Sequence, residues 1–151
     1  MALDDIYKEV ILDHYKNPRN KRELVGAELR CHANNPLCGD EITVFAHVEG
    51  DTVAEVTFQG AGCSISQSSA SMMTEAVTGS SVEDSIALAA SFRGMMAGEV
   101  EPDEESFGDL VALKGVVQYP IRIKCAVLAW DVLQDALAGS GTADGARSHT
   151  V

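Results

Sequence analysis

Basic residues are scarce in this sequence. It has 11 Lys and Arg residues against 23 Asp and Glu residues, a formal net charge of −12 at pH 7 and a sequence pI of about 4.5. Proteins that bind nucleic acids draw much of their affinity from Lys and Arg side chains that neutralise phosphates, so this composition argues against a nucleic-acid-binding protein. An acidic surface favours solubility and steering toward a basic partner, but an acidic surface without a specific partner explains the charge equally well.

Long hydrophobic runs are absent as well. No stretch approaches the length that a membrane-spanning helix needs. The first ten residues, MALDDIYKEV, lack the basic segment followed by an apolar segment that marks a secretory signal peptide. We therefore expect a cytoplasmic protein with no membrane partner. With 151 residues, of which 46% are hydrophobic, the chain suits one domain built around one core.

Histidine is also rare, with four residues in the chain. They do not form a ligand set with a nearby general base, so a zinc hydrolase is not indicated. We expect His14 to cap or pack near the end of the first helix. His32 and His47 are expected on or beside strands as surface or packing residues, and a role for His32 near Cys38 stays open.

The hydrophobic pattern predicts an α+β fold. Apolar residues at helical spacing indicate a first helix over residues 3–15, which ends before Asn17-Pro18. Residues 24–30 are a weaker strand candidate, and residues 42–48 and 53–58 alternate as an antiparallel hairpin with one buried face. Further helices are predicted over residues 64–77, 81–96, 107–113 and 121–138. Residues 1–138 are thus expected to form a single domain, followed by a flexible polar tail over residues 139–151.

Three of the four cysteines fall at breaks between these predicted elements. Cys38 lies in a loop before a strand, Cys63 follows Gly-Ala-Gly at a strand-to-helix junction, and Cys125 lies in the first turns of the last helix. Ligands from separate elements converge at such positions, and helix N-termini stabilise thiolates, the form that binds metal and attacks sulfur. A reducing compartment disfavours structural disulfides, so metal binding or thiol chemistry is indicated, with small buried cysteines as the alternative.

Asp40 fits this set as a fourth ligand, because Zn²⁺ accepts sulfur and oxygen donors together in a tetrahedral site. A carboxylate is a weaker partner for iron than a thiolate, so the set also suits an iron–sulfur cluster that must leave later. Gly39 and Gly62 remove side chains beside Cys38 and Cys63, which lets a metal or partner approach closely. Because Cys-x-Asp is short and common, spacing alone leaves metal binding and an incidental thiol both open.

Three sequence blocks resemble a known family. NPLCGD at 35–40, GAGCSISQSS at 60–69 and RIKCAVLAW at 122–130 are similar to the motif blocks of the IscU/SufU family of iron–sulfur cluster assembly proteins, which is related to the N-terminal domain of NifU. The resemblance also includes IYKEVILDHYKNPRN and extends to about Gly139. It implies an α+β fold in which a small antiparallel sheet carries helices on one face. It also implies that Cys38, Asp40, Cys63 and Cys125 gather at one exposed edge as metal ligands.

Two features resemble the SufU branch of this family. Lys124 stands where IscU-type scaffolds have a histidine, and the segment between Cys63 and Cys125 is longer and contains SFRGMMAGE. The SufU resemblance implies a bound zinc and a persulfide relay, rather than a stand-alone enzyme. Its partner would be a SufS-type cysteine desulfurase that uses pyridoxal phosphate, with downstream Suf scaffold proteins as further candidates. It implies that Cys38 accepts the sulfur while Asp40, Cys63 and Cys125 hold the metal.

Two other functions stay open. The same thiolates would hold a nascent 2Fe–2S cluster for transfer to apo-proteins, which would make the chain a scaffold. Alternatively, zinc would only stabilise an interaction domain, although a chain of this size can build a core without metal.

Residues near the predicted ligands need their own interpretation. Arg122 precedes Cys125 by one helical turn, and we expect it to add positive charge near the thiolates, against the alternative of a solvated arginine. Lys124 has the same two interpretations. Cys31 lies outside the three blocks, and we expect it to be a bystander thiol on a strand.

Overall fold

The computed structural model describes residues 5–35, 39–138 and 147–150. Its elements follow the order α1 (Asp5–Lys16), β1 (Leu29–Asn35), β2 (Asp40–Glu49), β3 (Thr52–Ala61), α2 (Ser64–Val77), α3 (Val82–Met96), α4 (Glu104–Phe107), the 3-10 helix η1 (Gly108–Gln118), α5 (Pro120–Ala138) and β4 (Arg147–Thr150). One small sheet and a set of helices confirm the predicted α+β fold.

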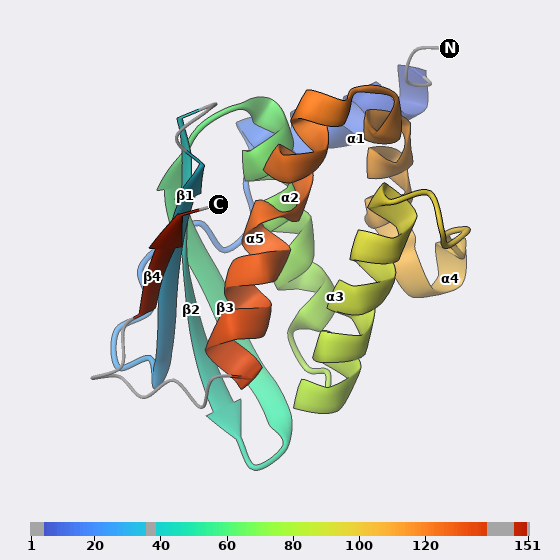
Figure 1. Ribbon diagram of the computed structural model, residues 1–151. Coiled ribbons are helices and arrows are strands. Elements are labelled where there is room, and N and C mark those ends of the chain that lie inside the picture. Colours follow the sequence, from blue (N-terminus) through green and yellow to red (C-terminus); the bar gives the residue numbers. More distant parts are fainter. Residues whose placement is uncertain (1–4, 36–38, 139–146, 151) are drawn as a thin grey trace.

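The sheet has the strand order β3-β2-β1-β4, and its first three strands pair in antiparallel fashion. Figure 1 shows α2 and α5 packed against one face of the sheet, with α3 on the far side of these two helices. The helices therefore cover one face, as predicted. This arrangement places the start of β2 near the starts of α2 and α5.

The β2–β3 hairpin keeps the predicted alternation in its first strand and departs from it in the second. Inward residues of β2 are fully buried as far as Ala46. The register then shifts between His47 and Val48. In β3, Val53 is fully buried whereas Ala54 is half-buried. Strict alternation over residues 53–58 predicts that Ala54 points inward with Val56 and Phe58. That prediction is wrong for Ala54, because such a shift changes which side chains face the core.

The first strand lies further along the chain than predicted. It is β1, which pairs with β2 from Leu29 opposite Ala46 to Asn35 opposite Asp40, and residues 24–28 precede it. Its buried side chains are small or polar: Cys31, Ala33 and Asn35. A strand without large alternating apolar residues gives little sequence signal, which explains why the prediction was misplaced. The strand position of Cys31 agrees with the prediction for that residue.

The helices begin where their sequence signals indicate. Helix α2 has the predicted bounds, and α3 begins after Ser81, whose Oγ accepts a hydrogen bond of 2.9 Å from the Asp84 N–H. Helix α5 begins at Pro120. The helix predicted over residues 107–113 is instead the end of α4 followed by the longer η1, which begins at Gly108 with φ 54°. None of the described helices is long and apolar enough to cross a bilayer.

A buried contact ties α2 to α5. The Ser69 Oγ donates a hydrogen bond of 2.6 Å to the Ala126 carbonyl and accepts one of 3.2 Å from the Trp130 Nε1. The Trp130 ring also stacks on Phe92 of α3, with ring centroids 4.9 Å apart. These contacts fix the two helices that carry Cys63 and Cys125.

Part of the predicted tail belongs to the sheet. Residues Arg147–Thr150 form β4, which pairs with β1 in parallel, with Cys31 opposite Arg147 and Asn34 opposite Thr150. These four residues fall within the range predicted as a flexible tail; the other tail residues lie outside the described ranges. The edge of a sheet offers unpaired N–H and C=O groups to any extended segment, so pairing here does not need an alternating hydrophobic pattern.

Candidate metal centre

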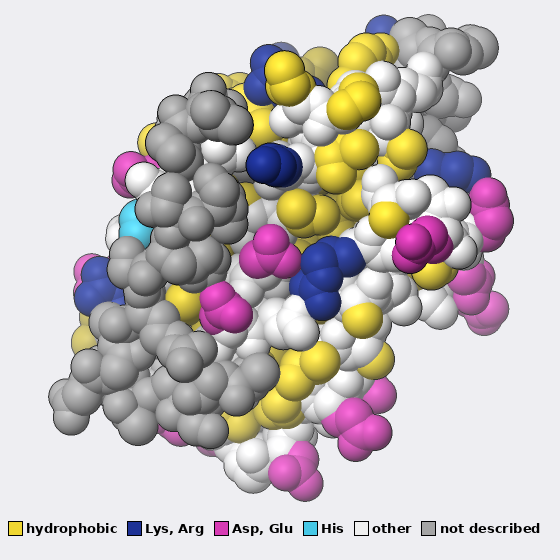
Figure 2. Space-filling model, viewed as in Figure 1, with side chains coloured by type: hydrophobic (Ala, Val, Ile, Leu, Met, Phe, Trp, Pro, Cys, Tyr) yellow, Lys and Arg dark blue, Asp and Glu magenta, His cyan; other side chains and the backbone are white. Residues whose placement is uncertain are grey.

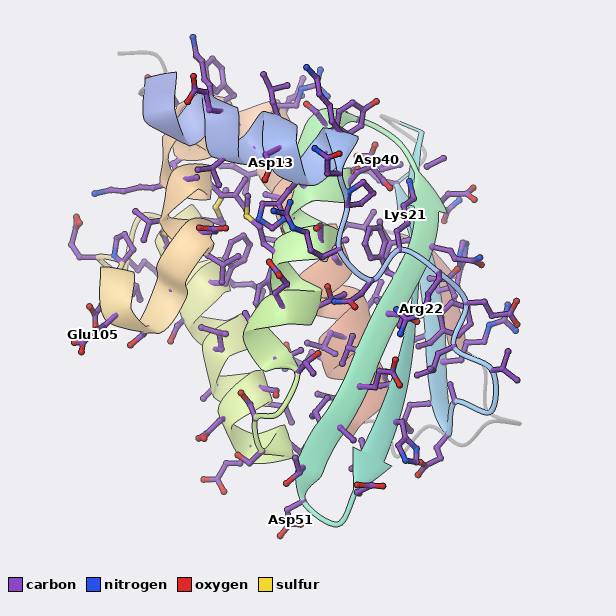
Figure 3. The ribbon with its side chains drawn as sticks, turned by 180° about the vertical axis from the view of Figure 1, so that it is seen from behind. Asp13, Lys21, Arg22, Asp40, Asp51 and Glu105 are labelled. Carbon is purple, nitrogen blue, oxygen red and sulfur yellow. The ribbon has the colours of Figure 1, made fainter. Side chains whose placement is uncertain are left out.

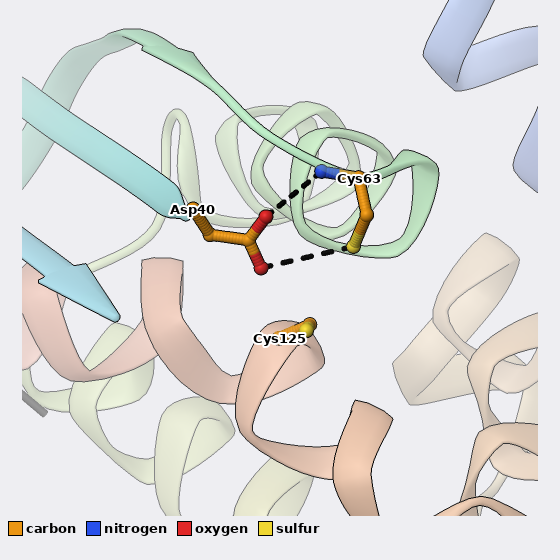
Figure 4. Close-up of side chains that lie close together, drawn as sticks. All are labelled: Asp40, Cys63 and Cys125. Carbon is orange, nitrogen blue, oxygen red and sulfur yellow. Dashed lines mark hydrogen bonds between the residues drawn. The ribbon is translucent and has the colours of Figure 1, made fainter. Parts of the chain in front are cut away.

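Three of the four predicted ligands converge from three elements. Asp40 is the first residue of β2, Cys63 immediately precedes α2, and Cys125 lies in α5 (Figure 4). One oxygen of Asp40 and the sulfurs of the two cysteines lie within 4.8 Å of one another. Asp40 and Cys125 are buried and Cys63 is half-buried, so the group is less open than the exposed edge that was predicted. Cys38 lies outside the described residues.

Asp40 holds Cys63 in place. Its Oδ1 accepts a hydrogen bond of 2.8 Å from the Cys63 backbone N–H, and its Oδ2 lies 3.7 Å from the Cys63 Sγ (Figure 4). A carboxylate that binds the backbone with one oxygen keeps the other oriented toward the sulfur. Figure 3 shows Asp40 at the start of β2, close to the start of α2.

Gly62 lets Asp40 reach this position. A Cβ on Gly62 would lie 2.1 Å from the Asp40 Oδ1, and the residue has φ 151°. The prediction that Gly62 makes room for a metal or partner is therefore corrected, since the space is occupied by the carboxylate of Asp40. Gly39 has open space around it, and its φ of 73° explains why glycine suits the position.

Cys63 acts as the N-cap of α2. Its Sγ accepts a hydrogen bond of 3.5 Å from the Ser66 N–H and lies 3.9 Å from the Ser66 Oγ. The first N–H groups of a helix have no partner within the helix, and the Cys63 sulfur accepts from one of them. Sequence reasoning missed Ser66, although the spacing of a cap residue and a partner three positions later could have identified it.

Arg122 lies beside both sulfurs. A hydrogen bond to Cys125, together with attraction to the sulfurs of Cys63 and Cys125, raises the pKa of the Arg122 guanidinium above its ordinary value. Arg122 is exposed, so solvent screens this attraction. The structure therefore places Arg122 where the sequence predicted it, next to the candidate ligands.

The described histidines do not join this group. The His32 Nδ1 lies 2.8 Å from the Thr43 Oγ1 on the neighbouring strand, and His47 pairs with Glu28. Both agree with the predicted packing and surface roles. His14 is buried and contacts Ser71, so it packs rather than caps its helix.

The donor set suits zinc. Bonds of about 2.3 Å to sulfur and 2.1 Å to oxygen place tetrahedral ligands about 3.6 Å apart. The 3.7 Å between the Asp40 Oδ2 and the Cys63 Sγ agrees with this spacing. Two sulfurs and one carboxylate oxygen leave one position of a tetrahedron for a fourth donor. Iron accepts the same donor types, so the donor set alone does not distinguish the two metals.

The sequence matches one family model and is similar to known proteins over most of its length. Residues 6–126 match the family model described as "NifU-like N terminal domain". "Zinc-dependent sulfurtransferase SufU" of Bacillus subtilis (strain 168) is 46% identical over 136 residues, covering 90% of this chain and 92% of that protein. "Iron-sulfur cluster assembly scaffold protein IscU" of Streptococcus pyogenes serotype M1 is 40% identical over 149 residues, covering 99% of this chain and 93% of that protein.

Solved structures share the fold. A structure from Fervidobacterium islandicum AW-1, described as "Putative iron-sulfur cluster assembly scaffold protein for SUF system", superposes with a TM-score of 0.81 at 34% identity, covering 87% of this chain and 96% of that one. The N-terminal part of a NifU-like protein from Brucella abortus has a TM-score of 0.82 at 24% identity, covering 89% and 94%. The second likeness concerns the fold alone.

Proposed function

The chain belongs to the NifU-like N-terminal domain family, and from this premise we propose that it works in iron–sulfur cluster assembly as a zinc-dependent sulfur acceptor. In this proposal Cys38 receives sulfur from a SufS-type cysteine desulfurase. The observation that carries the proposal is the convergence of Asp40, Cys63 and Cys125 in space, with Asp40 only two residues after Cys38 in the sequence. The name of the relative that is 46% identical supports the choice of zinc.

The transfer step is a thiol–persulfide exchange at Cys38. The Cys38 thiolate attacks the outer sulfur of a persulfide on the donor. The donor's sulfur–sulfur bond breaks, its cysteine leaves as a thiolate, and a persulfide forms on Cys38. One sulfur–sulfur bond replaces another, so the step needs no oxidant or reductant.

The other site residues would bind the metal or balance the negative charge of the sulfurs. Asp40, Cys63 and Cys125 would bind Zn²⁺ together with Cys38, and the bound ion keeps the thiols deprotonated. The Asp40 carboxylate keeps Cys63 oriented through its bond to the Cys63 N–H. Arg122 offsets negative charge beside the sulfurs. Asp40, Cys63 and Cys125 can retain the ion while Cys38 carries sulfur.

An exposed surface next to the site supports docking of a partner protein. Near the start of α5, Tyr119 is 45% exposed and Ile121 is 80% exposed, and both adjoin Arg122. Figure 2 shows hydrophobic side chains spread over the α3 and α5 face, with Lys and Arg side chains among them. Large exposed apolar side chains beside a positive charge are typical of interaction surfaces.

The proposal is tested by a transfer assay. Cys38→Ala should bind a purified desulfurase but receive no persulfide sulfur and give no stimulation of desulfurase turnover. Cys31→Ala is the matched control, because it also removes one thiol but lies in the core away from the site. Full stimulation by Cys38→Ala would refute the assignment.

A scaffold function is the second candidate, and the name of the 40% identical relative favours it. Metal analysis of the purified chain separates the two. Stoichiometric zinc that survives dialysis and is lost in Asp40→Ala supports sulfur transfer. A labile 2Fe–2S cluster that replaces zinc during anaerobic reconstitution at physiological metal levels supports the scaffold.

A further inference from the structure

A second group of metal-binding side chains lies away from the thiols. His14 of α1, Glu75 of α2 and Asp109 of η1 each place one ligand atom within 4.8 Å of the others. Cys63 and Glu75 are separated by 12 positions along α2, or about 18 Å at 1.5 Å per residue. The two groups therefore share no residue and lie at different ends of the same helix.

The imidazole of His14 is held firmly at the centre of this group. The side chain is 1% exposed, and its Nδ1 lies 2.8 Å from the Ser71 Oγ. Its Nε2 lies 3.0 Å from the Asp109 Oδ2 and 3.9 Å from the Glu75 Oε1. The two carboxylates are 60% and 50% exposed, so the buried ring presents one nitrogen to two oxygens that solvent reaches.

Ser71 can orient the ring for metal binding. Its Oγ accepts a hydrogen bond of 2.8 Å from the Arg19 backbone N–H, and a hydroxyl oxygen has a second acceptor position for a proton on the His14 Nδ1. In that tautomer the Nε2 lone pair faces the two carboxylates. A partner on one ring nitrogen commonly fixes the other nitrogen as a metal ligand. A bound metal would take the place of the 3.0 Å contact between the His14 Nε2 and the Asp109 Oδ2.

Room for the rest of a coordination shell lies beside this group. Glu75 and Asp109 line a surface cavity of about 260 Å³, whose walls also include Met72, Phe107 and Glu105. The cavity is open enough for water molecules to complete the coordination of an ion. Access from solvent lets the ion exchange without local unfolding.

We propose that His14, Glu75 and Asp109 form a second metal site, for a divalent first-row transition ion such as Mn²⁺ or Fe²⁺. One imidazole nitrogen and two carboxylate oxygens match the donor preferences of these ions. Arg19 lies 4.0 Å from Glu75 and is bound mainly to Asp13 at 2.7 Å. Its positive charge lowers the affinity, so the site binds weakly and exchanges its ion. The inference does not depend on the sulfur-transfer proposal.

Mn²⁺ binding to the zinc-loaded chain tests this site. Electron paramagnetic resonance should show one saturable Mn²⁺ per chain, and its pulsed spectrum should show a nitrogen coupling from His14. Glu75→Gln should weaken Mn²⁺ binding at least about tenfold, because it removes a ligand. We expect the variant to keep the His14–Asp109 contact and to fold, since Glu75 is half exposed and lies 3.9 Å from the ring nitrogen.

Glu105→Gln is the matched control. It removes one carboxylate from the same cavity but none of the three grouped ligands, and it should leave the Mn²⁺ affinity within about twofold. Equal losses in both variants would identify diffuse attraction to acidic side chains and overturn the proposal. Absence of saturable binding, or bound Mn²⁺ without nitrogen coupling, would overturn it as well.

Discussion

The backbone N–H of Cys63 donates a hydrogen bond of 2.8 Å to the Oδ1 of Asp40. This bond joins the start of β2 to the start of α2, and it links two candidate ligands that are 23 positions apart in the sequence. A ligand held through one oxygen needs little reordering when its other oxygen binds a metal. The two candidate ligands therefore hold each other in place through this bond.

Gly62→Ala should disturb the metal centre through Asp40. The added Cβ would lie 2.1 Å from the Asp40 Oδ1, so the carboxylate must move away from Cys63. We expect lower stability and zinc that is removed by dialysis. Gly98→Ala is the control, because Gly98 has φ 78° and open space around it. That change should cost about 1 kcal/mol for the backbone alone and leave zinc bound. Equal zinc retention in both variants would show that Asp40 does not need the space.

Arg122→Gln should weaken zinc binding a few fold, because the guanidinium offsets the negative charge of the Cys63 and Cys125 sulfurs. A competition titration with a chromophoric chelator measures this change. Lys124→Gln removes an equal charge from the same helix turn and serves as the control, with no expected change. An identical loss in both variants would point to net charge rather than the contact with sulfur.

Ser69→Ala should destabilise the protein by about 1–3 kcal/mol, because the buried Trp130 N–H and Ala126 carbonyl lose their partner. Urea unfolding followed by Trp130 fluorescence gives the free energy of unfolding. Ser68→Ala is the control, since the Ser68 hydroxyl donates a hydrogen bond of 3.2 Å to the Ile65 carbonyl within its own helix. A cost for Ser69→Ala no larger than for the control would contradict the role of the link between α2 and α5.

Asp13→Asn should reduce stability at neutral pH and not in acid. Hydrogen bonds from Arg19 and Asn17 lower the pKa of the Asp13 carboxyl below its ordinary value. A carboxyl whose pKa is lowered on folding stabilises the protein above its unfolded value, and this contribution is lost as pH falls through its folded value. Thermal unfolding of both proteins at neutral pH and well below pH 3.8 measures the difference. Asp51→Asn, at the exposed hairpin turn, is the control; a difference that persists in acid would refute the assignment.

Much of the fold follows from local sequence signals, and the departures have physical causes. The helices over residues 64–77 and 82–96 begin after cap residues and carry apolar faces, so their bounds are close to those predicted. The predicted position of strand β1 was wrong because the buried residues of this strand are small or polar and give little sequence signal. The tail strand β4 was missed because its pairing depends on the free edge of β1 rather than on its own side chains.

For the metal centre, the sequence by itself determined the donor types and their positions at element boundaries. The sequence places Asp40 just before a predicted strand, Cys63 after Gly-Ala-Gly, and Cys125 early in a predicted helix. Only the tertiary structure decided that these atoms meet within 4.8 Å, and that the missing side chain of Gly62 leaves room for the Asp40 carboxylate. The same holds for the group of His14, Glu75 and Asp109, which come from three separate elements. The physical reason is that helix and strand signals are local, whereas the meeting of distant side chains depends on how the sheet and helices pack.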